Sequence, residues 1–147
     1  MSITGTRKEF SSPFFIAIVP YDGFRITFTS INPHPMLGVQ FLDTTITKES
    51  YVRDISFART IAFTEELEML KELGLGKGGT IENVVVYDKT SCLSVPRCDD
   101  ELVRHKVLDI IGDLSLLGRP VRGHIIAVKS SHKLNNLLTH KIFEEMQ

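Results

Sequence analysis

The sequence RHKVLDIIGD, at residues 104–113, combines the apolar periodicity of a helix with a row of polar side chains. His105, Asp109 and Asp113 recur at every fourth position, which places them along one side of that helix. The surrounding apolar residues are too numerous for a surface helix, so we expect most of it to be buried. Ionisable groups in a core must be paired, bound to a metal or open to a cleft. The apolar positions are Leu102, Val103, Val107, Leu108, Ile110, Ile111, Leu114 and Leu117.

The polar row has two interpretations. In the first it is a structural network, in which His105 bonds to Asp109 while Asp113 caps or pairs locally; an isolated His-x-x-x-Asp favours this interpretation. In the second it is a metal site, because a neutral imidazole and a carboxylate one helical turn apart can both reach a single divalent ion. Zinc accepts such nitrogen and oxygen ligands. The spacing alone leaves both interpretations open.

Composition narrows the class of protein. A chain of 147 residues is long enough for one domain with a real core. The balance of 17 basic against 18 acidic residues predicts no nucleic-acid partner. No apolar run is long enough to span a bilayer, so we expect no transmembrane segment. Cys92 and Cys98 form neither a CxxC pair nor a disulfide framework, which favours the reducing cytoplasm as the location.

The first third of the chain predicts strands. Residues 14–19 form an apolar run, and residues 24–31 alternate apolar with polar side chains. The turn at residues 21–23, Tyr-Asp-Gly, predicts that these two strands form a hairpin. We expect a third strand at 39–44. The polar residues 1–12 are expected to be a flexible tail or a linker remnant.

Helices and strands alternate in the rest of the chain. We expect helices at 48–54 and 65–73, and a strand at 83–87 that pairs with residues 92–95. The glycine-rich stretch 74–79 lacks the order of a phosphate-binding loop and is interpreted as a helix end followed by a turn.

Two further histidines lie outside the central helix. The helix ends near Leu117, and a strand at 124–128 leads into the last helix through His132. A histidine at such a turn can point into a cleft and transfer protons, or it can be an ordinary polar turn residue. His34, between two prolines, is expected at the surface.

Four motifs support a family resemblance. They are ART at 58–60, GLGKGGTIENVVV at 74–86, the block ending RHKVLDIIGDLSLLG at 97–118 and KSSHKLNN at 129–136. In this order and spacing, they resemble the C-terminal domain of UDP-3-O-acyl-N-acetylglucosamine deacetylase, the zinc enzyme of lipid A synthesis. The resemblance covers the chain from about residue 13 onward and favours the metal interpretation of the polar row.

The resemblance implies a fold and a substrate. The fold is α+β, a two-layer sandwich of a mixed β-sheet and two main helices, with residues 13–147 as the C-terminal domain. A βαβ insertion at 61–88 would form an apolar passage for the acyl chain. The substrate would be UDP-3-O-acyl-N-acetylglucosamine, held in an active site between two domains.

The resemblance also implies roles for individual residues on the metal side of the site. His105 and Asp109 fall on two zinc ligands of the family. Lys106 falls on the lysine that helps to hold the substrate. Zinc would polarise the amide carbonyl and activate water for its hydrolysis.

Three further residues fall on catalytic positions of the family. His132 matches the histidine that gives a proton to the leaving amine or stabilises the oxyanion. Asp113 matches the carboxylate that orients this imidazole. Thr60 matches the threonine that hydrogen-bonds the oxygen of the tetrahedral intermediate.

The sequence also departs from the family pattern. The third zinc ligand and the glutamate base of the family lie in an EHLLAAL-like helix of the N-terminal domain. No such motif occurs in these 147 residues, so we expect the N-terminal domain to be absent. Ile61, Leu102 and Ser131 replace residues usual in the family, and Ser131 is expected to constrain the turn before His132. A catalytic zinc site has three protein ligands, so we expect an incomplete site and no turnover by the chain alone.

Two outcomes follow for the biology of the chain, and whether it is itself an enzyme stays open. The chain could be half of a deacetylase, completed by an N-terminal domain partner or by self-association. Alternatively, it could be a non-catalytic domain derived from that enzyme, which binds a sugar nucleotide, an acyl chain or another protein.

Overall fold

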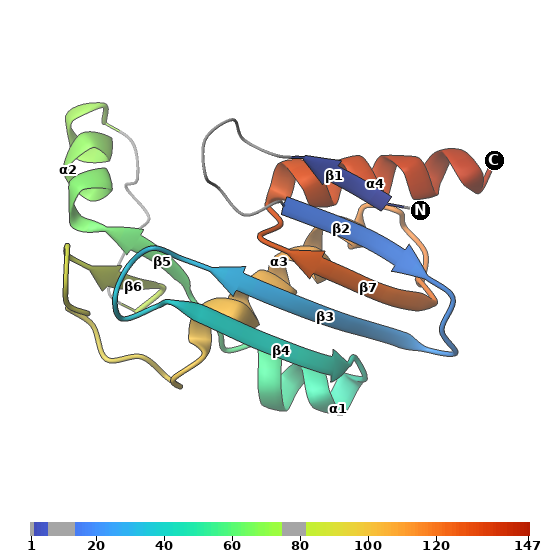
Figure 1. The fold of residues 1–147 in the computed structure, drawn as a ribbon, viewed down its shortest axis with the longest axis horizontal. Coiled ribbons are helices and arrows are strands. Elements are labelled where there is room, and N and C mark those ends of the chain that lie inside the picture. Colours follow the sequence, from blue (N-terminus) through green and yellow to red (C-terminus); the bar gives the residue numbers. More distant parts are fainter. Residues whose placement is uncertain (1, 6–13, 75–81) are drawn as a thin grey trace.

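A computed structural model describes residues 2–5, 14–74 and 82–147 and shows an α+β fold, as predicted (Figure 1). A mixed five-stranded sheet runs in the order β1-β2-β7-β3-β4. Figure 1 shows the helices α3 and α4 together behind this sheet, so the two layers of the predicted sandwich are present. The strands of the sheet are β1 (Ser2–Gly5), β2 (Phe14–Val19), β3 (Phe24–Ile31), β4 (Val39–Thr45) and β7 (Gly123–Val128).

The remaining elements lie between β4 and β7 or after β7. A short helix after β4, capped by the side chain of Thr47, continues directly as a π-helical turn. A separate two-stranded sheet, β5-β6, follows it. These elements are α1 (Lys48–Ser50), η1 (Tyr51–Ile55), β5 (Thr60–Phe63), α2 (Thr64–Glu72), β6 (Val84–Tyr87), α3 (Glu101–Ser115) and α4 (His132–Glu145).

The predicted hairpin between the first two apolar strands is wrong, although the strand bounds are right. β7 lies between β2 and β3, antiparallel to the first and parallel to the second. The turn at residues 20–23 therefore crosses the beginning of β7, where the Gly123 N–H donates to the Gly23 carbonyl at 2.8 Å. The residues of the turn predict only that the chain reverses direction, not that the two strands are neighbours. The central position in the sheet, between β2 and β3, is occupied by β7, an apolar strand whose Ile125 is fully buried.

The expected tail over residues 1–12 also needs correction. Ser2–Gly5 form β1, which pairs antiparallel with β2 from Ser2 opposite Ala17 to Gly5 opposite Phe14. An extended segment close to a free sheet edge can satisfy the backbone groups of that edge, whatever its side chains are. The rest of the expected tail, Met1 and residues 6–12, lies outside the described residues.

The core forms where α3 packs on the sheet. Val103, Val107 and Ile110 of α3 are fully buried against a cluster that includes Phe28 and Ile125. The prediction of a buried helix is confirmed, although two of its apolar residues, at positions 108 and 111, are only partly buried. The buried predicted positions are Leu102, Val103, Val107, Ile110, Leu114 and Leu117.

The unit β5-α2-β6 is a βαβ unit that projects beside the main sheet (Figure 1). Its strands are parallel, with Thr60 opposite Val84 and Phe63 opposite Tyr87. A second, smaller cluster of buried residues joins β6 of this unit to α3 and to the β3–β4 loop; its members are Leu37, Val85, Tyr87 and Leu102. The predicted strand at 92–95 is reduced to one bridge, between Tyr87 and Cys92. Residues 75–81, which include most of the glycine-rich stretch, lie outside the described residues.

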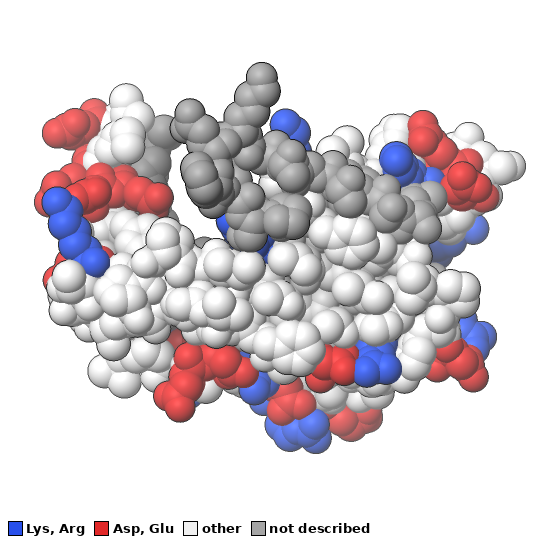
Figure 2. All heavy atoms as spheres, in the orientation of Figure 1, with Lys and Arg blue, Asp and Glu red and all other residues white. Residues whose placement is uncertain are grey.

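The face of the sheet that points away from the helices carries few charges. Figure 2 looks onto this face and shows uncharged atoms over the strands, with charged side chains along the lower rim. On β4, Val39 and Phe41 are 70% and 61% exposed. Arg25 and Asp43 form an ion pair within the sheet. The hydrogen bond from Arg25 lowers the pKa of Asp43 to about 2, so the carboxylate stays ionised and the two opposite charges offset each other.

Candidate active site

The beginning of α3 is fixed by a buried carboxylate. Glu101 is 4% exposed, and its Oε1 accepts bonds from the backbone N–H of Arg59 at 3.0 Å and from Arg59 Nε at 2.8 Å. Its Oε2 accepts a bond from the Arg97 N–H at 2.6 Å. Burial raises the pKa of Glu101, but the bonds from Arg59 and Arg97 outweigh burial and hold the pKa below its usual value. The ART segment is thereby attached to the first turn of α3.

His105 follows one turn later and faces the same segment. Its Nδ1 lies 3.2 Å from the carbonyl oxygen of Ala58, and its Nε2 lies 3.2 Å from Asp109 Oδ1. A carbonyl oxygen only accepts hydrogen bonds, so Nδ1 carries the proton. The neutral ring then presents the lone pair of Nε2 to a carboxylate oxygen. Two acceptors at this distance require a cation between them, either a proton or a metal ion.

His132, the first residue of α4, reaches the same carboxylate from the other side. Its Nδ1 lies 2.9 Å from Asp113 Oδ2, and its Nε2 lies 3.6 Å from Asp109 Oδ1. The His132 side chain is 65% exposed, whereas those of Asp109 and Asp113 are 10% and 14% exposed. The carboxylates are therefore sheltered in the helix layer, and the imidazole that they hold stays accessible from solvent.

Lys106 forms an ion pair with Asp109. Its Nζ lies 3.2 Å from Asp109 Oδ2, on the carboxylate oxygen that faces away from the two imidazoles. Lys106 also lines a cavity of about 310 Å³ together with Thr60, Lys129 and Ser130. Thr60 is exposed at the beginning of β5, two residues after the Ala58 carbonyl that contacts His105. The cavity therefore opens beside the histidine–carboxylate cluster.

The structure thus brings five of the six predicted site residues into one chain of contacts and places the sixth, Thr60, in the adjoining cavity. The five residues in contact are His105, Lys106, Asp109, Asp113 and His132.

The donor set suits a divalent cation. If Asp113 holds the proton of His132 on Nδ1, both imidazoles direct the lone pair of Nε2 toward Asp109 Oδ1. Nitrogen and carboxylate oxygen are ligands that zinc accepts. In the part of the chain that the structure describes, no group of three or more His, Cys, Asp or Glu residues is arranged to hold a metal ion. Among the described residues, His105 and Asp109 could hold one, with the Nε2 of His132 beside them.

Sequence reasoning missed two residues behind the cluster. Asn135 is 2% exposed, and its Nδ2 donates to Asp113 Oδ2 at 2.9 Å. Ser130 is 6% exposed, and its hydroxyl donates to Asn135 Oδ1 at 2.6 Å. Both lie in the KSSHKLNN motif, in which the sequence pointed only to His132 and to the turn at Ser131. Asn135 lies three residues after His132, on the same side of α4, and that spacing could have indicated that both contact Asp113.

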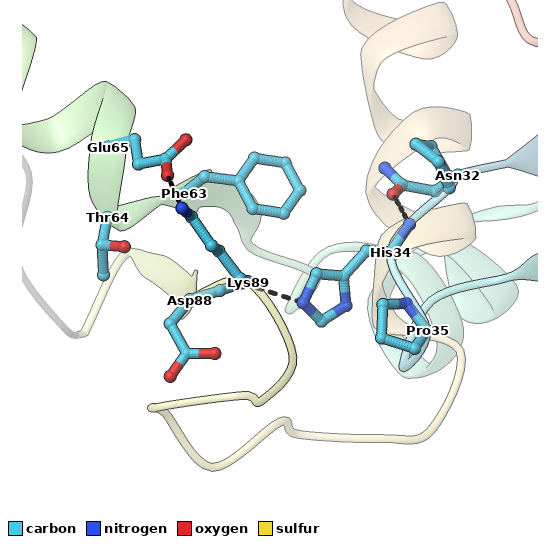
Figure 3. A pocket seen from close by; sticks show the side chains of 9 residues that line it. Asn32, His34, Pro35, Phe63, Thr64, Glu65, Asp88 and Lys89 are labelled. Atoms are coloured by element: carbon cyan, nitrogen blue, oxygen red, sulfur yellow. Dashed lines mark hydrogen bonds and ion pairs between the residues drawn. The ribbon is translucent and has the colours of Figure 1, made fainter.

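His34 is buried, not at the surface as expected. Its Nε2 lies 2.9 Å from the Asp88 carbonyl, and its Nδ1 lies 3.2 Å from the Met36 N–H. The Met36 N–H donates to Nδ1, so the proton of the ring is on Nε2. His34 and Phe63 line a second cavity, of about 360 Å³, between the β3–β4 loop and the βαβ unit (Figure 3). His34 thus fastens that loop to the end of β6.

Comparisons with known proteins identify the family to which the chain is similar. The family model for UDP-3-O-acyl N-acetylglycosamine deacetylase (LpxC) matches residues 6–144. A deacetylase of this name from Chlamydia felis is 45% identical over 136 residues, which is 90% of this chain and 49% of the relative. One from Myxococcus xanthus is 43% identical over 131 residues, 88% of this chain and 42% of the relative. One from Nitratidesulfovibrio vulgaris is 46% identical over 123 residues, 82% of this chain and 40% of the relative.

Fold and cluster together define an α+β domain with a histidine–carboxylate site on its central helix. Because the family model matches residues 6–144 of the 147, the chain belongs to the UDP-3-O-acyl N-acetylglycosamine deacetylase family. It spans somewhat less than half the length of the relatives named above. None of the described helices is long and apolar enough to cross a membrane.

Proposed function

We propose that this chain forms the C-terminal half of the active site of a zinc-dependent deacetylase. The reaction would hydrolyse the acetamide of UDP-3-O-acyl-N-acetylglucosamine and release acetate, as a step of lipid A synthesis. The observation that carries the proposal is the approach of two imidazole Nε2 atoms to Asp109 Oδ1, at 3.2 and 3.6 Å. The free thiols of Cys92 and Cys98 fit a reaction in the reducing cytoplasm.

His105 and Asp109 would hold the metal. The Ala58 carbonyl keeps the His105 ring in the tautomer that leaves Nε2 free to ligate, which is the usual task of an outer partner of a metal ligand. Bound zinc would polarise the amide carbonyl and lower the pKa of a water molecule. Lys106, bonded to the other oxygen of Asp109, would leave Oδ1 as the ligating oxygen.

His132 and Asp113 would handle the proton of the leaving amine. Because Nδ1 of His132 is bonded to Asp113, the proton that the ring gives up is the one on Nε2. The exposure of the His132 side chain leaves it accessible to a substrate. After amide cleavage the ring would be neutral, with its remaining proton held by Asp113.

The cavity beside the cluster would receive the reacting part of the substrate. Thr60 would hydrogen-bond the oxygen of the tetrahedral intermediate, and preorganised donors of this kind are effective stabilisers of developing charge. Lys106 and Lys129 bring positive charge to the same cavity, which suits a substrate that carries a diphosphate.

The βαβ unit would accept the acyl chain. On α2 and just after it, Met69 and Leu73 are 56% and 66% exposed. Apolar side chains at the surface of a small unit beside the cavity suit contact with a hydrocarbon chain.

The 147-residue chain by itself is expected to lack turnover. A catalytic zinc site takes three protein ligands and keeps one position open, whereas His105 and Asp109 supply two. An N-terminal domain, or a second protein that carries the equivalent helix, would complete the site.

Zinc affinity of the purified chain tests this proposal. We expect weak binding that is lost in His105→Ala and retained in His140→Ala, because His140 lies exposed on α4 far along the helix from the cluster. Tight stoichiometric zinc would contradict an incomplete site, and zinc-dependent release of acetate by the chain alone would contradict the need for a partner. Addition of the N-terminal half of a relative should produce activity if the proposed function is correct.

A further inference from the structure

The buried side-chain amide of Asn135 contacts the Asp113 carboxylate that binds His132. Asp113 Oδ2 accepts two hydrogen bonds, from His132 Nδ1 and from Asn135 Nδ2, both at 2.9 Å. Asn135 is among the most buried polar residues of the described chain, at 2% exposure. A buried amide must satisfy its hydrogen bonds, so this contact is costly to break.

The orientation of this amide is fixed from two sides. Ser130 donates to Asn135 Oδ1 at 2.6 Å, and the Asp113 carboxylate can only accept, so it requires the N–H side of the amide. Thr139 also donates, at 2.9 Å, to the backbone carbonyl of Asn135. A flipped amide would place two oxygens against each other at Asp113. The hydrogen bonds of Ser130, Asn135 and His132 therefore converge on Asp113: Ser130 donates to Asn135, and Asn135 and His132 both donate to the Asp113 carboxylate.

We propose that Asn135 is a positioning residue that, oriented by Ser130, sets the Asp113 carboxylate so that it holds the His132 ring with Nδ1 protonated and Nε2 toward Asp109. The terminal torsion of an aspartate is broad, so one hydrogen bond to an exposed imidazole leaves the carboxylate free to rotate. A second, buried donor to the same oxygen removes that freedom. The inference rests on the proposed function for its catalytic meaning, but its geometry is a property of this chain alone.

The test measures the tautomer of the His132 ring by nitrogen NMR in the 147-residue chain, at a pH at which the ring is neutral. We expect the Nδ1-protonated form to dominate in the wild type, because Asp113 accepts from Nδ1. Asn135→Asp keeps the size of the side chain but replaces the donor with an oxygen, and it should shift the ring toward the Nε2-protonated form. Asn136→Ala, the exposed neighbour on α4, is the control and should leave the tautomer unchanged.

Ser130→Ala provides a second route if Asn135→Asp does not fold. It removes only the hydroxyl that orients the amide, and we expect a partial shift in the same direction. An Nε2-protonated ring in the wild type would overturn the proposal. So would a folded Asn135→Asp or Ser130→Ala chain that keeps the wild-type tautomer.

Activity separates this inference from the proposed function. With an N-terminal half added, Asn135→Asp should lower kcat by roughly ten- to a hundred-fold, as loss of an outer partner does, and leave KM nearly unchanged. A tautomer shift with no deacetylase activity in any variant, wild type included, would contradict the proposed function alone. Activity that is unaffected by a proven tautomer shift would contradict the catalytic importance of Asn135.

Discussion

The imidazole of His132 and the carboxylate of Asp113 meet at 2.9 Å although they lie on different helices, the first at the beginning of α4 and the second near the end of α3. Their alignment depends on the packing of the two helices as well as on the hydrogen bond between them. A substitution at either residue should therefore disturb the alignment of the His132 imidazole.

Asp113→Asn tests the proton-transfer pair. The amide removes the anion that holds Nδ1 of His132, so we expect kcat to fall by about 10²- to 10⁴-fold in the deacetylase reconstituted with an N-terminal half. Asp99→Asn, an exposed position just before α3, is the matched control. Steady-state kinetics provide the measurement, and an unchanged kcat would exclude Asp113 from the proton-transfer step.

Glu101→Ala tests the attachment of the ART segment to α3. Arg59 would remain in the core, 9% exposed, without its carboxylate partner. Loss of one member of a buried pair predicts a decrease of about 3–5 kcal/mol in the free energy of unfolding. Urea unfolding measures it. Glu65→Ala breaks the exposed Glu65–Lys89 pair as a control and should change little; similar losses in both variants would contradict a special role for burial.

The stability of the chain in acid should also depend on Glu101. Its pKa in the folded state lies below the ordinary value, so its contribution is fully present above the unfolded-state pKa of about 4.3. That contribution is lost as the pH falls through the lower folded-state pKa. Urea midpoints measured across this range should fall more steeply with acid in the wild type than in Glu101→Gln. Parallel curves would mean that other carboxylates dominate acid unfolding.

Ile110→Ala tests the core under α3. Ile110 is fully buried in the main cluster, and truncation of a buried isoleucine costs about 2–5 kcal/mol. Leu116→Ala, at the 75% exposed C-cap position of α3, should stay within about 0.5 kcal/mol of the wild type. Denaturant unfolding compares the two, and equal costs would contradict the burial pattern of the helix.

His34→Ala tests the fastening of the β3–β4 loop to the βαβ unit. The substitution leaves the Asp88 carbonyl and the Met36 N–H without their imidazole partner, which predicts a loss of about 1–3 kcal/mol. Hydrogen exchange should increase mainly in β6 and in the loop. His140→Ala is the control, and an equal increase in exchange across the main sheet would rule out a local effect.

The positions of the helices and strands could be predicted from the sequence more easily than which strands pair with one another. The 3.6-residue periodicity around residues 104–113 locates α3, because it depends only on the side chains of one helix. The pairing of β2 and β3 with β7 depends on a strand about a hundred residues further along, which no local pattern encodes. For the same reason β1 was missed, since its pairing comes from a free sheet edge and not from its own residues.

In the site, too, residues on one helix could be predicted together, whereas residues brought together by tertiary packing could not. His105, Asp109 and Asp113 share one helix, so their spacing alone brings them into line. His132 could be joined to them only through the family resemblance, because the packing of α4 on α3 has no signature in either helix. His34 was misjudged because two flanking prolines indicate a loop, and a loop can still be covered by a βαβ unit that folds over it.

The central position of β7 determines when the sheet can be completed during synthesis of the chain. The Thr27–His124 contact, at 2.7 Å, spans 97 residues of sequence, so the middle of the sheet stays open until β7 has been synthesised. Until then β2 and β3 each expose an apolar strand with an unpaired edge, which favours association between nascent chains. A premature stop before residue 123 would remove β7 and leave these two strand edges without their partner.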